Sequence, residues 1–326
     1  MKQVKFGNTG KEVTQIGLGT WQLGTKWGDP FNEVEAQKIL RTAYENGINL
    51  IDTADGYNGG NSEIEIGKFL KGKREKMYIV TKCGRRLQPH VAEGYTAEAM
   101  EQFIDNSLKR MDIEQIDTIL LHCPPTSVYQ KDELFAGLDR IKKSGKIASY
   151  GVSIEKVEEG LKAMDYDISA MEVIFNMFRL KPTEELFVKT KEKNVAVLAR
   201  VPLASGLLTG RYSKDTVFGE QDHRTFNRNG EAFDKGETFS GVDYQLGLQA
   251  VEKLQELFGT NDLIPYALRW ILMHDAVTTV IPGASNANQV LSNIRAAQMA
   301  PLTVEQMQRV GDIYNRYIRE SVHGNW

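Results

Sequence analysis

Short apolar runs alternate with amphipathic stretches along almost the whole chain. The runs have the length of buried strands, and the stretches between them carry apolar residues three or four positions apart, as helices do. Eight runs are expected to be strands: Gln15–Leu18, Asn49–Asp52, Met77–Thr81, Thr118–Leu121, Ala148–Val152, Ala170–Phe175, Val195–Ala199 and Thr278–Ile281. This alternation is typical of repeated βα units, and eight such strands close a (β/α)8 barrel, the TIM barrel.

The stretches between the strands predict the helices that would cover them. They are expected at Glu33–Glu45, Ser62–Leu70, Ala97–Arg110, Lys131–Lys143, Lys156–Met164, Pro182–Lys191, Val242–Phe258, Asp262–His274, Ala287–Ala297 and Thr303–Arg319. Ahead of the barrel, Val4–Phe6 and Glu12–Thr14 flank a turn and predict a β-hairpin that closes one end. Residues 1–326 are therefore expected to form a single α/β domain.

One segment breaks this rhythm. From Leu203 to Gly241, after the seventh strand, the chain is rich in Gly, Ser, Asn and charges and has little helical or strand period. A connection of this length is long for a compact domain, and such loops are usually functional or disordered.

A doubly wound open sheet would show the same alternation of strands and helices. That fold commonly binds dinucleotides through Gly-x-Gly-x-x-Gly after a strand. Here Gly17 and Gly19 are followed by Thr20-Trp21-Gln22, so the third glycine is missing. The glycine pattern favours the barrel.

Composition and charge restrict the partners and the location. The balance of 40 Lys+Arg against 43 Asp+Glu gives a net charge of -3, which argues against nucleic acid as a partner. The amino terminus lacks the apolar core of a signal peptide, and no segment has the apolar length that spans a bilayer. The two cysteines fit a reducing compartment. We expect a cytoplasmic protein that binds a small molecule, in an oligomeric state that the sequence leaves open.

Three apolar runs end in polar residues. Asp52, Lys82 and His122 end the second, third and fourth predicted strands, and Tyr57 follows Asp52 by five residues. Sequential strands of a barrel are neighbours, and reactive groups lie where the strands end. The four side chains are therefore expected to meet in one pocket.

These residue types suit proton transfer to a carbonyl oxygen. The ammonium of Lys82 would favour the phenolate of Tyr57, and Asp52 would keep Lys82 charged and oriented. His122 would direct a donor toward the same oxygen. On placement alone, a structural ion pair of Asp52 and Lys82 explains the pattern about as well.

Longer motifs decide between these explanations. IDTADGY, NSEIEIGKFL, IVTKCG, LLHCPP and GVSI, with VPLASGLLTGRY and IPGASNANQVLSNIRA, resemble the aldo-keto reductase family over nearly the whole chain. The resemblance is particularly to the bacterial branch related to the potassium-channel β subunits. It implies a catalytic tetrad of Asp52, Tyr57, Lys82 and His122, with Tyr57 as general acid and a nicotinamide cofactor as hydride donor.

The resemblance also implies the sites of substrate and cofactor. Trp21, Tyr57 and His122 would line the substrate pocket. The length and composition of loop 203–241 lead to the separate hypothesis that it orders over the bound cofactor. The implied cofactor-binding residues are Gly19, Thr20, Trp21, Asp52, Ser153, Glu172, Arg200, Pro202, Leu203, Ser205, Gly206, Leu208, Arg211, Gly283, Ser285, Gln289 and Asn293.

Some of these positions depart from the family pattern. Ile154 and Glu172 stand where Asn and Gln usually hold the carboxamide, and Asn176 is a nearby substitute. Arg200 replaces a stacking aromatic, and a guanidinium plane also stacks on a ring. Gln289 stands where many members place a cation against the 2′-phosphate, so NADP(H) is favoured on family grounds and NAD(H) is possible.

The expected activity is reduction of an aldehyde or ketone to an alcohol, with hydride from the cofactor and a proton from Tyr57. Two alternatives stay open: a Schiff-base barrel aldolase that acts through Lys82, and a cofactor-sensing regulatory subunit with little turnover. The five histidines show no ligand spacing, so no metal site is expected.

Overall fold

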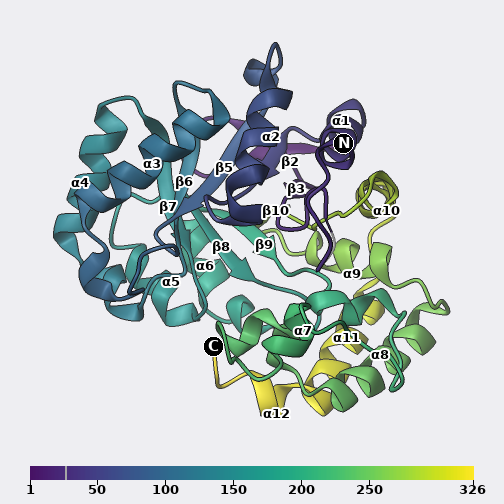
Figure 1. The fold of residues 1–326 in the computed structure, drawn as a ribbon. Helices are drawn as coiled ribbons and strands as arrows, with labels where there is room; N and C mark the ends of the chain where they lie inside the picture. The colour runs from purple at the N-terminus through teal and green to yellow at the C-terminus, as the bar shows by residue number, and fades with distance from the viewer. Residues whose placement is uncertain (26–27) are drawn as a thin grey trace.

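A computed structural model describes residues 1–25 and 28–326 and has the predicted barrel (Figure 1). Its eight parallel strands pair in sequence order. They are β3 (Leu18–Gly19), β4 (Leu50–Asp52), β5 (Tyr78–Cys83), β6 (Ile116–His122), β7 (Ile147–Ser153), β8 (Ala170–Ile174), β9 (Ala196–Arg200) and β10 (Val277–Val280). The ring closes where Ile16 bridges Val280 and Gly19 bridges Gly283. The predicted fold class is confirmed.

Helices follow the strands and cover the outside of the ring (Figure 1). They are α1 (Glu33–Glu45), α2 (Asn61–Leu70), α3 (Ala97–Met111), α4 (Asp132–Lys143), α5 (Val157–Ala163), α6 (Leu186–Glu192), α7 (His223–Phe226), α8 (Tyr244–Phe258), α9 (Ile264–Ile271), α10 (Ala287–Gln298), α11 (Val304–Tyr317) and α12 (Arg319–Val322). All six residues of β5 are buried because the strand lies between the barrel interior and this outer layer. In the described part of the chain, no helix is long and apolar enough to cross a membrane.

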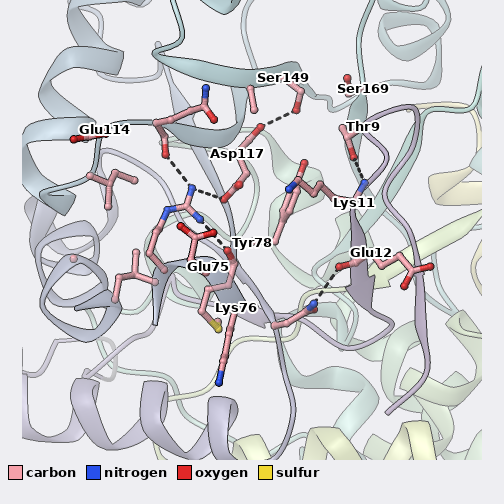
Figure 2. A pocket seen from close by; sticks show the side chains of 18 of the residues that line it. Thr9, Lys11, Glu12, Glu75, Lys76, Tyr78, Glu114, Asp117, Ser149 and Ser169 are labelled. Carbon is pink, nitrogen blue, oxygen red and sulfur yellow. Dashed lines mark hydrogen bonds and ion pairs between the residues drawn. The ribbon is translucent and has the colours of Figure 1, made fainter. Parts of the chain in front are cut away.

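The hairpin of β1 (Gln3–Lys5) and β2 (Glu12–Thr14) closes the end where the strands begin. Phe6 is fully buried, belongs to the barrel-interior cluster and lies 4.6 Å, ring to ring, from Tyr78. A groove of about 940 Å³ opens at this end, and Figure 2 shows side chains of both charges around it, such as Lys11, Glu75 and Asp117. Active sites of this fold lie at the opposite end, where the strands finish.

The long connection between β9 and α8 is ordered by short turns and by its own packing. It contains the 3₁₀ turns η6 (Ala204–Thr209), η7 (Lys235–Glu237) and η8 (Phe239–Gly241), together with α7. Phe239 is buried, and the guanidinium of Arg228 lies 5.0 Å from its ring centre. The segment is therefore folded against the barrel, although its sequence lacks a regular period.

Candidate active site

Lys82 is the centre of the site at the carboxyl ends of the strands. It lies on β5 with no exposed surface. Its Nζ is 2.7 Å from each carboxylate oxygen of Asp52, on the neighbouring β4, and 3.0 Å from the carbonyl oxygen of Thr53. A second carboxylate, that of Glu172 on β8, lies 3.2 Å from the same nitrogen. The ammonium is thus enclosed by oxygen atoms from two sides of the ring.

Tyr57 reaches this centre from the turn that follows β4. Its OH is 3.4 Å from Lys82 Nζ. The turn η1 (Tyr57–Gly60) reverses the chain through Asn58, whose φ of 51° is left-handed and whose side-chain amide donates to Leu23 O. The ring of His122, at the end of β6, lies edge-on to Tyr57 with 6.0 Å between ring centres. The structure thus brings the four predicted tetrad side chains together.

Burial controls the protonation of these groups. It raises the pKa of the Tyr57 phenol above its ordinary value; Lys82 opposes this effect, and Asp52 and Glu172 add to it. Burial disfavours the Lys82 ammonium, but the two carboxylates outweigh it and raise the pKa of Lys82. Burial, followed by the charge of Lys82, holds the pKa of His122 well below its usual range. The site holds a phenol, an ammonium and a neutral imidazole.

Lys82 acts on the pKa of Tyr57 in the expected direction, but other groups have a larger effect. The charge of Lys82 was expected to favour the phenolate, and it does lower the pKa of Tyr57. The loss of water around the phenol and the surrounding carboxylates have the larger opposite effect. Tyr57 is consequently protonated at neutral pH.

Trp21 and His223 form one wall beside the tyrosine. The ring of Trp21 is 6.5 Å from that of Tyr57 and 5.1 Å from that of His223 on α7. Trp21 therefore stands where the substrate pocket was predicted, and the long connection supplies a second ring that was not predicted.

A cluster of ion pairs lies next to the tetrad, and the sequence did not indicate it. Arg200, at the end of β9, is 2.9 Å from a carboxylate oxygen of Glu155 and 3.8 Å from one of Glu237. Arg85, beyond the end of β5, lies 3.4 Å from Glu237 and 3.9 Å from Glu155. The side chains of these two glutamates are only 13% exposed. Glu237 belongs to η7, so this cluster joins the long connection to the strand ends.

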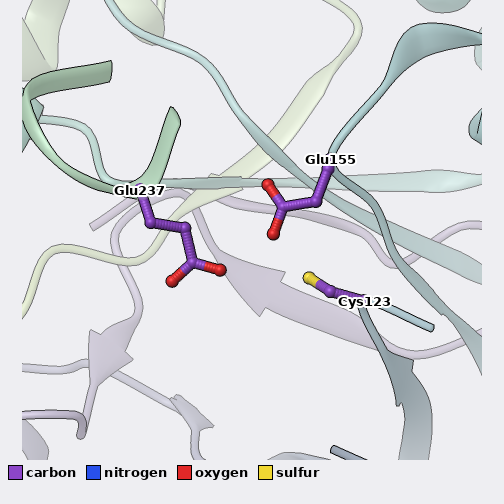
Figure 3. Close-up of side chains that lie close together, drawn as sticks. All are labelled: Cys123, Glu155 and Glu237. Atoms are coloured by element: carbon purple, nitrogen blue, oxygen red, sulfur yellow. The ribbon is translucent and has the colours of Figure 1, made fainter. Parts of the chain in front are cut away.

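Figure 3 shows that Glu155, Glu237 and Cys123 converge, with ligand atoms within 4.8 Å of one another. Both carboxylates are already paired with guanidinium groups, which would repel a cation. Burial, opposed by Arg200 and reinforced by Glu237, raises the pKa of Glu155 to about 8. Arg200 and Arg85 outweigh burial and hold the pKa of Glu237 below its usual value. The two neighbouring acids are therefore shifted in opposite directions, and Glu155 is the more readily protonated of the two.

Two residues predicted to bind the cofactor, Ser153 and Glu172, lie close to the tetrad. Ser153 ends β7, pairs with Glu172 in register and has its hydroxyl 3.4 Å from Cys123 Sγ. Glu172 Oε2 is buried and lies 3.2 Å from Lys82 Nζ, but among the described residues it has no contact with the geometry of a hydrogen bond. An amide N–H would satisfy this oxygen, so a carboxylate can replace the expected amide at this position.

Arg200 and Asn176 were also expected near the nicotinamide ring, and both are held by hydrogen bonds within the protein. Arg200 is 9% exposed, and its guanidinium donates to Glu155 and to Ile154 O, which fixes the plane that was expected to stack on the ring. Asn176 is fully buried and bonded to Val201 O and Ser240 Oγ. Asn176 thus supports the long connection and does not substitute for a carboxamide ligand.

The first strand and the turn after β9 carry the next group of predicted cofactor residues. The backbone N–H of Thr20 donates to Asp52 O, which ties the residues after Gly19 to the tetrad. Pro202, Leu203 and Leu208 lie in or beside η6, where Leu208 N donates to Leu203 O. A Cβ on Gly206 would lie 2.2 Å from Tyr212 OH, so this tight turn requires glycine.

Ser205 and Arg211 are arranged less simply than predicted. The hydroxyl of Ser205 donates to Glu237 O and accepts from Phe239 N, so it holds the two ends of the long connection together. Arg211 is exposed and lies 3.9 Å from Asp262, which also has Arg295 at 3.7 Å. The hydroxyl of Ser205 is thus occupied by hydrogen bonds within the protein, whereas the guanidinium of Arg211 is accessible to a phosphate.

The start of α10 carries the last group of predicted residues. Gln289 accepts hydrogen bonds from Ser285 N and Ser285 Oγ, and the amide of Asn293 donates to Gly283 O. Asn286 caps the helix through Gln289 N. These polar groups surround a helix N-terminus, which favours an anion.

Sequence reasoning missed Arg85, Glu155, His223 and Glu237. Arg85 and Glu155 follow the ends of β5 and β7, so the strand-end rule that selected the tetrad would also have selected them. His223 and Glu237 come from the long connection, where no periodicity indicates which residues face the barrel.

Comparisons with known proteins agree with this fold. The model of the Aldo/keto reductase family matches residues 15–315. An NADH-specific methylglyoxal reductase from Escherichia coli (strain K12) is 30% identical over 318 residues, which cover 91% of this chain and 93% of that protein. The holo form of an aldo-keto reductase from Bacillus halodurans has a TM-score of 0.77 at 28% identity and covers 96% of both chains. A glycerol dehydrogenase from Gluconobacter oxydans has a TM-score of 0.78 at 27% identity, over 97% of this chain and 96% of that one.

Proposed function

Because the chain belongs to the aldo/keto reductase family, we propose that it reduces an aldehyde or ketone to an alcohol with a reduced nicotinamide cofactor. The observation that carries the proposal is the Tyr57 hydroxyl 3.4 Å from the fully buried ammonium of Lys82. When bound, the cofactor supplies the hydride that the carbonyl carbon receives.

In this proposal the chain's own residues manage the proton. Tyr57 OH donates its proton to the carbonyl oxygen, and the nearby ammonium of Lys82 stabilises the phenolate that remains. Asp52 keeps Lys82 charged and in place through two contacts of 2.7 Å. His122, as a neutral imidazole, donates a hydrogen bond to the same carbonyl oxygen and orients the substrate.

We propose NADP(H) as the preferred cofactor, with NAD(H) as the alternative. The polar start of α10, with Ser285 and Gln289, supports a bound 2′-phosphate. The exposed Arg211 supports a bound diphosphate. The Escherichia coli relative is named as NADH-specific, so both cofactors belong in the test.

The aldolase alternative is disfavoured by the state of Lys82. A Schiff base requires a neutral amine that reaches the substrate. Here the amine is fully buried, and Asp52 and Glu172 raise its pKa.

The experiment is oxidation of NADPH and of NADH with a panel of carbonyl compounds that includes methylglyoxal. Tyr57→Phe is expected to lower the rate by about 10² to 10⁴ because the general acid is lost, while cofactor affinity stays nearly unchanged. Tyr166→Phe is a matched control, because its hydroxyl bonds Asp132 on α4, outside the ring. An active Tyr57→Phe enzyme would contradict the mechanism. Cofactor binding without turnover of any carbonyl would support a regulatory subunit, and borohydride trapping on Lys82 would support the aldolase.

A further inference from the structure

Two carboxylates compete for the ammonium that acts on Tyr57. Asp52 is bonded to Lys82 through both of its oxygens at 2.7 Å. Glu172 also lies 3.2 Å from Lys82, its side chain is only 2% exposed, and its charge adds to burial in raising the pKa of Asp52 well above its usual range. One positive charge therefore faces two buried carboxylates, and an ammonium has three protons to offer to all its neighbours.

The second carboxylate is not required to keep Lys82 in the barrel. Asp52 alone provides a paired charge, and Thr53 O accepts another of the ammonium's protons. Burying a further carboxylate is costly unless it is compensated. Glu172 has partial compensation from Arg200, whose Nε is 3.9 Å from Glu172 Oε1, but Arg200 is closer to Glu155.

Electrostatics connects Glu172 to the phenol. The Tyr57 oxygen and the Glu172 carboxylate both lie within 3.4 Å of one nitrogen, so Glu172 weakens the positive potential at the phenol. The charged and titratable groups that face Tyr57 and Glu172 from the surrounding elements are Asp52 on β4, Lys82 on β5, His122 on β6, Arg200 on β9 and Glu237 on η7.

We propose that Glu172 is a positioning residue, which acts through Lys82 to hold Tyr57 in its protonated form and so favours carbonyl reduction over alcohol oxidation at neutral pH. The inference rests on the proposed function. Reduction consumes the proton of Tyr57, and oxidation needs the phenolate as a base. Charge on Glu172 stabilises the phenol and thereby extends the pH range of reduction upward.

The test is Glu172→Gln, which keeps the shape and an acceptor oxygen but removes the charge. With an effective dielectric constant of about 20, removing the charge of Glu172 is expected to lower the pKa of Tyr57 by about 1 to 2 pH units. We expect the pH at which carbonyl reduction declines, and the pH at which alcohol oxidation rises, both to fall by at least about 1 unit. Glu63→Gln is the matched control, because Glu63 is equally buried but pairs with Arg110 outside the barrel.

A second readout does not depend on turnover. In cofactor-free protein labelled with ¹³C at tyrosine Cζ, Tyr57→Phe identifies the Tyr57 resonance. Its titration should move to lower pH in Glu172→Gln and stay in place in Glu63→Gln. If the parent reduces no carbonyl, the proposed function fails, yet this titration still tests Glu172.

An unchanged Tyr57 titration in folded Glu172→Gln would overturn the inference, even if activity fell. Circular dichroism establishes that the variant is folded. If it is not, Glu172→Asp withdraws the carboxylate from Lys82 by one methylene, and a smaller shift in the same direction is expected. No shift in a folded Glu172→Asp protein would then count against the inference.

Discussion

Lys82 is stable without water contact because its neighbours replace the lost hydration. Burying an ammonium costs several kcal/mol, and a buried charge that loses its partner destabilises a protein by about 3 to 5 kcal/mol. Asp52, Glu172 and the carbonyl of Thr53 supply the compensation. The same contacts that stabilise the residue place its charge beside Tyr57, so stability and chemistry depend on one arrangement.

Asp55 is a buried residue with weaker compensation, which comes from the charges of Arg110 and Arg86. Neither of its carboxylate oxygens has a hydrogen-bond partner among the described residues. Burial, reinforced by the charge of Glu63, raises the pKa of Asp55 to about 6. Because the folded state holds this proton more tightly than the unfolded chain, Asp55 contributes stability below its ordinary pKa. That stability is lost as the pH rises through about 6.

The stability of the Asp55→Asn variant relative to the parent should therefore increase as the pH rises. Relative to the parent, the free energy of unfolding of the variant should increase by about 1 to 2 kcal/mol between pH 4 and pH 8, since the amide never ionises. Urea unfolding at several pH values measures this difference. A difference that stays constant across this range would contradict the prediction.

The grouping of the tetrad could be predicted at the level of single residues, whereas the cluster beside it could not. Asp52, Lys82 and His122 end consecutive strands, so strand order alone makes them neighbours. Glu237 reaches Arg85 and Arg200 from a segment without periodicity, and its position depends on how that segment packs. Long-range contacts of this kind leave no local signal in a sequence.

At the scale of elements, the connection between β9 and α8 is the least regular part of the site and the part most closely tied to it. Its own contacts hold it: Arg224 lies 4.5 Å from the ring centre of Phe218, and Trp326 donates to Asp234. Glu237 then reaches the arginines at the strand ends. Closing such a segment over a cofactor excludes water from the reaction.

Hydrogen exchange should show whether this segment responds to the cofactor. With saturating NADPH, we expect slower amide exchange in residues 203–241, because bound cofactor would oppose local opening. The hairpin of residues 3–14 is the internal control, since it lies at the other end of the barrel. Equal exchange in the long segment with and without NADPH would argue against ordering.

Most elements could be predicted because strands and helices of a barrel have distinct periods. The predicted and observed bounds of α1 coincide, since Asn32 caps its first turn and Asn46 ends it. The predicted and observed bounds of other helices differ near their ends. Pro182 lies in a 3₁₀ turn and α6 begins at Leu186. The last predicted helix is observed as α11, which ends at Tyr317, and the short α12 after it was not predicted.

At the scale of the whole molecule, the barrel depends on a seam between its first and last strands. Gly19 bridges Gly283, and a Cβ on Gly19 would lie 2.6 Å from Ile281 O. At Gly17 a Cβ would instead meet the side chains of Leu50, at 2.6 Å, and Ile281, at 3.2 Å, and the N–H of Gly17 donates to Val280 O. Because the contact at Gly19 is with backbone, which cannot move aside as a side chain can, Gly19 limits how closely the first and last strands approach.

Gly19→Ala should therefore destabilise the barrel. We expect a loss of about 1 to 3 kcal/mol in the free energy of unfolding, because the added methyl group separates the seam. Gly311→Ala is the control, since no atom lies within 4 Å of a Cβ at this position of α11. That change should raise stability by about 0.5 to 1 kcal/mol. Thermal unfolding of both variants measures the contrast, and equal melting temperatures would contradict it.

The seam also has a consequence for how the protein is made. Thr279 Oγ1 donates to Thr14 O, 265 residues away, so the partner of the first strand is synthesised near the end of translation. Until then, a nascent chain has two open sheet edges whose unpaired N–H and C=O groups can pair with other chains. The chain therefore passes through a stage with open sheet edges each time it is made, however stable the closed ring is.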